Sequence, residues 1–82
     1  MSDSYNHLFG QCINPLKTSV ISGGSSGGEG SIVSSLASPL GIGTDIGGSI
    51  RIPAALCGVY GLCSSAGRHP HEQFRWALLH WT

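Results

Sequence analysis

The fold of this chain is decided by Gly23-Gly24-Ser25-Ser26-Gly27-Gly28-Glu29-Gly30 and by Gly41-Ile42-Gly43-Thr44-Asp45-Ile46-Gly47-Gly48-Ser49-Ile50-Arg51-Ile52-Pro53. Glycine has the most conformational freedom to lose on folding, so a chain concentrates it where the backbone turns sharply or approaches a ligand. This chain does so twice, each time beside serine. The two segments are therefore interpreted as the backbone of an active site.

Around the first segment the sequence predicts a strand and a helix. The β-favouring run 18–21 enters the glycines, and a helix is expected from about 27 to 37, since Pro39 blocks its continuation. Ser26 and Glu29 have the spacing of a capping box, which makes Ser26 a helix cap rather than a catalyst. The expected apolar face of the helix consists of Ile32, Val33, Leu36 and Ala37.

The second segment predicts the same order of elements again. The expected elements are a strand over 40–45, a turn at Gly47-Gly48, an extended segment over 50–52, a helix that starts at Pro53 and is capped by Gly58, and a strand over 59–62. Strand, glycine turn and helix in repeated order predict an α/β fold with both glycine turns at one end of a sheet. That end carries the ligands in such folds.

Composition restricts the class of protein. Charged residues make up 10% of the chain and glycine 13 of 82 residues, against about 25% and about 7% in ordinary soluble domains. This profile predicts an interior piece of a larger domain.

Net charge is zero and the basic residues are scattered, so no nucleic-acid partner is expected. The polar start and the absence of a long apolar run predict neither signal peptide nor membrane span, which makes the cytoplasm the default location.

The cysteines and histidines give no metal site. Cys12, Cys57 and Cys63 are an odd number without a Cys-x-x-Cys pair, so buried free thiols are expected rather than disulfides or a zinc ribbon. A cluster of Cys57, Cys63, His69 and His71 matches no zinc spacing. No metal and no other cofactor is therefore predicted.

Two familiar functions of glycine-rich turns fit poorly. A phosphate-binding loop needs a lysine where Glu29 stands, and a carboxylate there would repel phosphate. The pattern Gly-x-Ser-x-Gly of a nucleophile elbow occurs around Ser25 and Ser26, but a chain of this length cannot hold the fold that uses it. The elbow would also leave the second segment unexplained.

A third interpretation uses both segments. Ser49 attacks a carbonyl group, and a serine of the first segment passes on its proton, since a serine hydroxyl needs a positioned base. The backbone amides of 46–49 converge on the developing oxyanion. Asp45 and Arg51 flank this turn and are expected to form a positioning ion pair or backbone hydrogen bonds rather than to transfer protons.

These segments, with Cys57-Gly58-Val59-Tyr60-Gly61-Leu62, resemble the signature of the amidase signature family. Asn6-His7-Leu8-Phe9-Gly10 and Asn14-Pro15 are similar to fungal amidases of acetamidase type. The resemblance implies a mixed sheet flanked by helices and hydrolysis of a carboxylic amide to an acid plus ammonia or an amine. It implies a Ser-cis-Ser-Lys triad, with Ser49 acylated and Ser25 bridging beside a cis peptide bond. The implied oxyanion hole consists of Ile46, Gly47, Gly48 and Ser49. Ser26, Thr44, Asp45 and Arg51 are expected to support the site.

The resemblance also sets expectations about what this chain lacks. It implies a lysine far upstream of the first segment, so that Lys17 does not inherit its role. Residues 1–70 are expected to be part of an amidase signature domain, and 71–82 a divergent tail. The alternative to a working amidase is a truncated, non-catalytic remnant that is prone to interactions. The expected partner is a small amide substrate. The sequence indicates neither which amide this is nor an oligomeric state.

Overall fold

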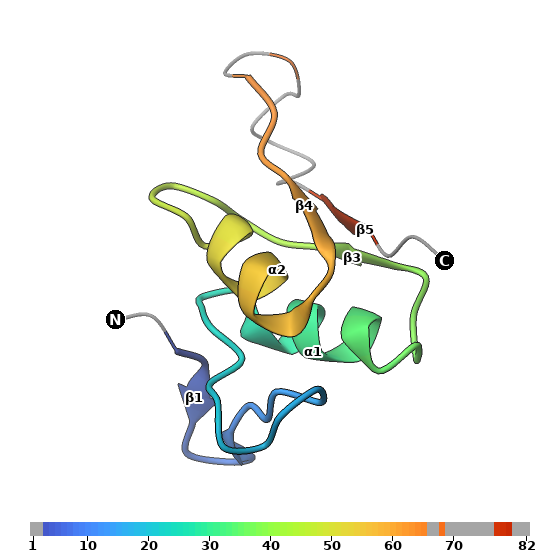
Figure 1. Cartoon of the computed structure of the whole chain (residues 1–82). Helices are drawn as coiled ribbons and strands as arrows, with labels where there is room; N and C mark the ends of the chain where they lie inside the picture. The colour runs from blue at the N-terminus through green and yellow to red at the C-terminus, as the bar shows by residue number, and fades with distance from the viewer. Residues whose placement is uncertain (1–2, 66–67, 69–76, 80–82) are drawn as a thin grey trace.

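Two short helices pack on one side of a small sheet, and a hairpin precedes them (Figure 1), in a computed structural model that describes residues 3–65, 68 and 77–79. The elements are β1 (Tyr5–Asn6), β2 (Gly10–Gln11), α1 (Gly27–Ser34), β3 (Leu40–Ile42), α2 (Arg51–Cys57), β4 (Tyr60–Leu62) and β5 (Ala77–Leu79). β1 and β2 form an antiparallel pair, and β5 lies between β3 and β4, antiparallel to both. The predicted α/β class is confirmed.

The core lies where the two helices meet. α1 contacts α2 and β3, and α2 contacts β4. The fully buried apolar side chains are Val33, Ile50, Pro53 and Cys57, with Ala54 beside them at 3% exposure. Many large apolar side chains elsewhere are exposed, including Leu8 and Phe9 of the hairpin loop. The glycine-rich composition thus gives a small core, as expected of a chain with few large residues between its turns.

The first helix is shorter than predicted. α1 ends at Ser34, and Leu36 takes a left-handed conformation with φ 63°. The Leu36 amide donates to Val33 O at 3.0 Å and the Ala37 amide to Ile32 O at 3.1 Å, which is the Schellman pattern of a helix end. The predicted apolar face is therefore wrong: Ile32 and Leu36 are exposed, and Val33 alone of the four is buried.

The other boundaries also shift. No strand forms over 18–21, where a single bridge joins Ile13 to Ile21, so the prediction that both glycine turns leave one end of a sheet is wrong for the first turn. β3 ends at Ile42. The segment 50–52 is not extended, because α2 begins at Arg51 and the Ile52 amide already donates to Gly48 O at 2.6 Å. Pro53 still lies in the first turn, where its missing amide is tolerated.

The end of the second helix follows the sequence prediction. Gly58 is left-handed with φ 67°, and the Val59 amide donates to Ala54 O at 3.0 Å. β4 then falls within the predicted strand.

The cysteines in the described residues are free. Cys57 is buried, its thiol donates to Ser22 O at 3.4 Å, and burial raises the pKa of that thiol. Cys12 and Cys63 are half-buried. Within the described ranges no three metal-binding side chains gather, and His69 and His71 lie outside them. None of the described helices has the length and apolarity to cross a bilayer.

Asn14 ties the segment before the first glycine turn to the end of α2. Its side chain is 1% exposed, and Nδ2 donates to Ile21 O at 3.2 Å and to Leu56 O at 2.8 Å. Oδ1 accepts from the Leu16 amide at 3.0 Å. Removing a buried side-chain amide that bonds three part-buried backbone groups is costly, because those groups lose their partners together.

We expect Asn14→Ala to lower the free energy of unfolding by about 1–3 kcal/mol, since it leaves three part-buried backbone groups without their partner. The measurement is a urea titration followed by circular dichroism. Asn6→Ala is the matched control, because Asn6 is exposed and its Oδ1 accepts only from the nearby Leu8 and Phe9 amides at 3.0 and 2.7 Å. Equal losses in the two variants would contradict this role for Asn14.

Candidate active site

The fold brings the two serine-containing segments together. The Ser26 amide donates to Ser49 O at 3.1 Å. The Ser26 hydroxyl accepts from the Thr44 amide at 3.2 Å and lies 3.4 Å from Thr44 O, to which it donates. Residues separated by about twenty positions in sequence are thus joined at three points. Because Ser25 immediately precedes Ser26, the predicted bridging serine and the predicted nucleophile belong to two adjoining loops.

Ser26 does not cap α1 with its side chain. It stands at the N-cap position, but its hydroxyl makes no bond to the helix amides, so the predicted capping box with Glu29 is wrong. The reason is competition, since the same hydroxyl bonds both backbone groups of Thr44. The Gly27 amide, the first of the helix, donates to the hydroxyl of Ser4 at 3.0 Å.

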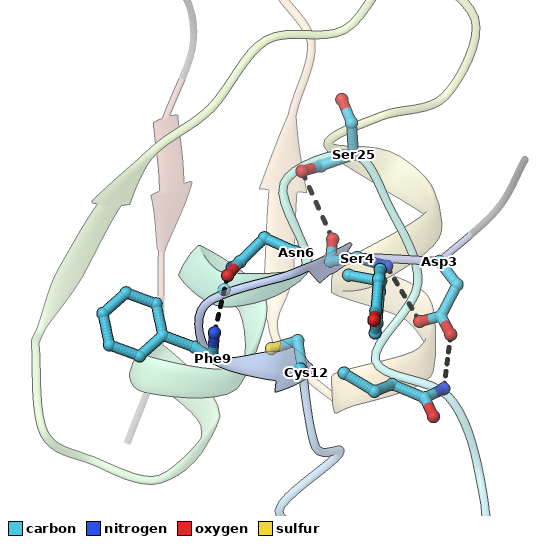
Figure 2. Close-up of a pocket in the computed structure, with 10 residues that line it drawn as sticks. Asp3, Ser4, Asn6, Phe9, Cys12 and Ser25 are labelled. Atoms are coloured by element: carbon cyan, nitrogen blue, oxygen red, sulfur yellow. Dashed lines mark hydrogen bonds between the residues drawn. The ribbon is translucent and has the colours of Figure 1, made fainter.

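Ser25 is exposed, and the peptide bond between Gly24 and Ser25 is cis, at the position where the resemblance implies one. Its carbonyl accepts a hydrogen bond from Ser4 Oγ at 3.3 Å. Its side-chain hydroxyl points away from Ser4 (Figure 2). The hydroxyl is therefore free for other partners while the backbone is held.

Gly23 is required by close packing beneath this loop. It has φ 81°, and a Cβ added there would lie 3.0 Å from Pro53 Cα. A side chain at this position meets both backbone strain and a clash with helix α2. The contact places the loop of residues 23–26, called the serine loop below, directly on helix α2, which follows Ser49.

A buried carboxylate organises the turn that carries Ser49. Asp45 Oδ1 accepts from the Gly48 amide at 2.6 Å, and Oδ2 accepts from the Ile50 and Arg51 amides at 3.1 and 3.2 Å. The Arg51 guanidinium donates to both carboxylate oxygens, from Nε at 3.0 Å and from Nη2 at 2.9 Å. The predicted ion pair is confirmed, with the Asp45 side chain fully buried and that of Arg51 58% exposed.

This network shifts both pKa values. The Arg51 guanidinium, with the Gly48, Arg51 and Ile50 amides, holds the pKa of Asp45 well below its usual range against the opposing effect of burial. Hydrogen bonding and charge from Asp45 raise the pKa of Arg51. Both groups are therefore charged at neutral pH and neither is suited to exchange protons during a reaction.

The backbone amides of the turn over residues 46–49 fall into two groups, one bonded to Asp45 and the other without a protein acceptor in the described residues. The Gly48 amide is taken by Asp45. Within the described residues, the amides of Ile46, Gly47 and Ser49 have no protein acceptor. Ile46 and Gly47 are exposed and Ser49 is half-buried. Three of the four amides predicted for an oxyanion hole are thus available to a ligand.

A pocket of about 480 Å³ lies between the hairpin and the serine loop (Figure 2). Its lining residues are Asp3, Ser4, Tyr5, Asn6, Phe9, Gly10, Gln11, Cys12, Ser25 and Gly28. Ser25 lies on its wall and Ser49 does not. The sequence did not indicate this role for the hairpin, and Ser4 in particular carries no local pattern that predicts its contacts with residues 23–27.

Comparison with known proteins identifies the family of the chain. The model of the Amidase family matches residues 1–78. The match extends beyond residue 70, where the sequence predicts the end of the amidase signature domain. That boundary remains a prediction. The chain is 48% identical over 79 residues to the putative amidase kk1C of Curvularia clavata, covering 96% of the chain and 15% of the relative.

Two further relatives come from different organisms. The chain is 54% identical over 66 residues to fatty-acid amide hydrolase 1 of Sus scrofa, covering 80% of the chain and 11% of the relative. It is 49% identical over 71 residues to an acetamidase of Emericella nidulans, covering 87% and 13%. The chain thus spans between 11% and 15% of the length of these relatives, and it belongs to the amidase family.

Proposed function

We propose that these residues form part of the active site of a serine hydrolase that cleaves a carboxylic amide to an acid and ammonia or an amine. The observation that carries the proposal is the backbone bond from Ser26 to Ser49, which joins the two serine loops. The family match and relatives named as amide hydrolases support the same reaction class.

In the proposed reaction Ser49 Oγ forms a bond to the amide carbonyl carbon. Its proton passes to Ser25, whose own proton passes to a lysine amine. The π electron pair of the carbonyl moves onto its oxygen, and the resulting oxyanion accepts hydrogen bonds from the free amides beside Ser49. As the carbon–nitrogen bond breaks, the leaving nitrogen takes a proton back through Ser25, and an acyl-enzyme ester remains on Ser49. Water then attacks the acyl carbon, the bond to Ser49 Oγ breaks, and a proton from the water returns to Ser49 as the acid leaves.

The proposal assigns the oxyanion to amides of the Ile46–Ser49 turn. Those of Ile46, Gly47 and Ser49 are the free donors, while Asp45 holds the Gly48 amide in the ground state. Asp45, Arg51, Thr44 and Ser26 act as positioning residues because their contacts fix the backbone of the two loops. The lysine is the one that the family resemblance implies, and Lys17 is not given its role.

A serine-directed fluorophosphonate tests the proposal. Such a probe phosphonylates a serine only where a base and oxyanion donors activate the hydroxyl. We expect stoichiometric labelling of the intact protein, with peptide mass spectrometry placing the adduct on Ser49 among the many serines of the chain. Labelling at another serine would overturn the assignment of the nucleophile. No labelling of a protein that melts cooperatively would favour the non-catalytic alternative.

A further inference from the structure

The hydroxyl of Ser4 makes three contacts with one loop. It donates to Gly23 O at 3.0 Å and is shared with Ser25 O at 3.3 Å, and it accepts from the Gly27 amide at 3.0 Å. A serine hydroxyl has one hydrogen and two lone pairs, so a bifurcated donation and one acceptance are within its capacity. One side-chain oxygen therefore spans both sides of Ser25, from Gly23 to Gly27.

Ser4 is itself held in place by the hairpin. The Cys12 amide donates to Ser4 O at 2.8 Å, and the Ser4 amide donates to Asp3 Oδ1 at 2.9 Å. The Gln11 amide group donates to the other oxygen of the Asp3 side chain (Figure 2). The Ser4 hydroxyl is thus anchored to a separate element and not carried by the loop that it contacts.

The loop is shaped to receive this contact. A Cβ added at Gly27 would lie 2.5 Å from Ser4 Oγ, and one added at Gly24 would lie 2.5 Å from Asp3 O. Both glycines therefore permit an approach that any side chain would prevent. The other serine of the loop, Ser26, is bonded to Thr44 and does not substitute for Ser4.

We propose that Ser4 is a positioning residue for proton transfer, whose hydroxyl sets the place of Ser25 relative to Ser49. The inference rests on the proposed function, because it concerns the bridging serine of that reaction. Ser4 touches the backbone on both sides of Ser25, while Ser26 ties the next residue to the Ser49 loop. Loss of the Ser4 bonds releases Ser25 without removing any group that reacts.

The activity test compares two substrates with the same acyl group, a p-nitroanilide and a p-nitrophenyl ester. The anilide nitrogen needs a proton from Ser25 as it leaves, whereas p-nitrophenolate leaves without one, so misplacing Ser25 harms the amide more. We expect Ser4→Ala to lower kcat/KM for the anilide by about 10²-fold and to lower the anilide-to-ester ratio by about tenfold. Ser4→Thr, which keeps the hydroxyl, is expected to restore the ratio.

Ser31→Ala is the matched control, because Ser31 Oγ also joins α1 to the N-terminal segment through one bond, to Ile13 O at 2.7 Å, without contacting the serine loop. Its anilide-to-ester ratio is expected to stay at the wild-type value. A purely structural role for Ser4 would lower kcat/KM for both substrates by the same factor, in proportion to the folded fraction. An unchanged anilide-to-ester ratio in Ser4→Ala therefore overturns the inference. If Ser4→Ala does not melt cooperatively, Ser4→Cys is used, and an unchanged ratio there has the same meaning.

A second measurement does not depend on activity. Hydrogen exchange followed by mass spectrometry on a peptide covering 23–30 is expected to be at least about tenfold faster in Ser4→Ala, since the Gly27 amide loses its acceptor. Equal hydrogen-exchange rates in the wild type and Ser4→Ala would contradict the bond from the Gly27 amide to Ser4 Oγ. A wild-type protein that hydrolyses neither substrate and takes no fluorophosphonate overturns the proposed function, and the exchange result then still decides whether Ser4 holds the loop.

Discussion

Replacing Ser49 with alanine is expected to abolish amide hydrolysis, with kcat falling on the order of 10⁶-fold, as when the nucleophile of a serine hydrolase is removed. The variant has no oxygen with which to form the acyl-enzyme, while the oxyanion donors of the turn remain. Stability should change little, because Ser49 is half-buried and its hydroxyl has no partner among the described residues. The measurement is single-turnover hydrolysis of a chromogenic anilide together with fluorophosphonate labelling.

Ser35→Ala is the control for this substitution. Ser35 is an exposed serine at the end of α1, and its hydroxyl donates only to Ile32 O, at 3.0 Å. Activity and labelling are expected to match the wild type in this variant. Retention of activity in Ser49→Ala would show that another residue is the nucleophile. Loss of both activity and cooperative melting would instead indicate that Ser49 supports the fold, contrary to its proposed role.

The sequence predicted both helices and the end of the second one, but not the end of the first helix or the absence of a strand over 18–21. The left-handed Gly58 cap follows from local chemistry, because glycine adopts that conformation without a Cβ penalty. The end of α1 does not, since Leu36 takes the same conformation without being glycine. The end of α1 is fixed by the backbone hydrogen bonds to Val33 O and Ile32 O, and no residue pattern in the sequence predicts these bonds.

Long-range contacts explain the remaining differences in the site. The capping box fails because the Ser26 hydroxyl contacts Thr44, 18 residues away. The partner of the first helix amide, that of Gly27, is Ser4, 23 residues away. Such partners become visible only when the hairpin and the two loops are placed in space. The Asp45–Arg51 pair could be predicted, since both residues flank one turn and only six positions separate them.

The Asp45 carboxylate should make the turn sensitive to acid. The pKa of Asp45 is lower in the folded protein than its ordinary value of about 4, so folding favours the ionised form. Its contribution to stability is therefore complete above pH 4 and is lost as the pH falls from there toward the depressed folded pKa. The carboxylate also holds the Gly48 amide beside the free donors, so acid should loosen the oxyanion turn together with the fold.

Asp45→Asn tests this argument, and we expect it to lower the rate of fluorophosphonate labelling by about 10²–10³-fold, the cost of losing an oxyanion donor. Asparagine has one acceptor oxygen where Asp45 uses two, and it brings no charge to hold the Arg51 guanidinium. Urea titrations between pH 3 and pH 7 should show that the variant loses less stability on acidification than the wild type. Arg51→Met is the comparison, because it removes the guanidinium and leaves the Gly48, Ile50 and Arg51 amides on the carboxylate. We expect its labelling rate to fall by about tenfold only. Equal losses in the two variants would mean that the ion pair, and not the backbone amides held by Asp45, keeps Ser49 in place.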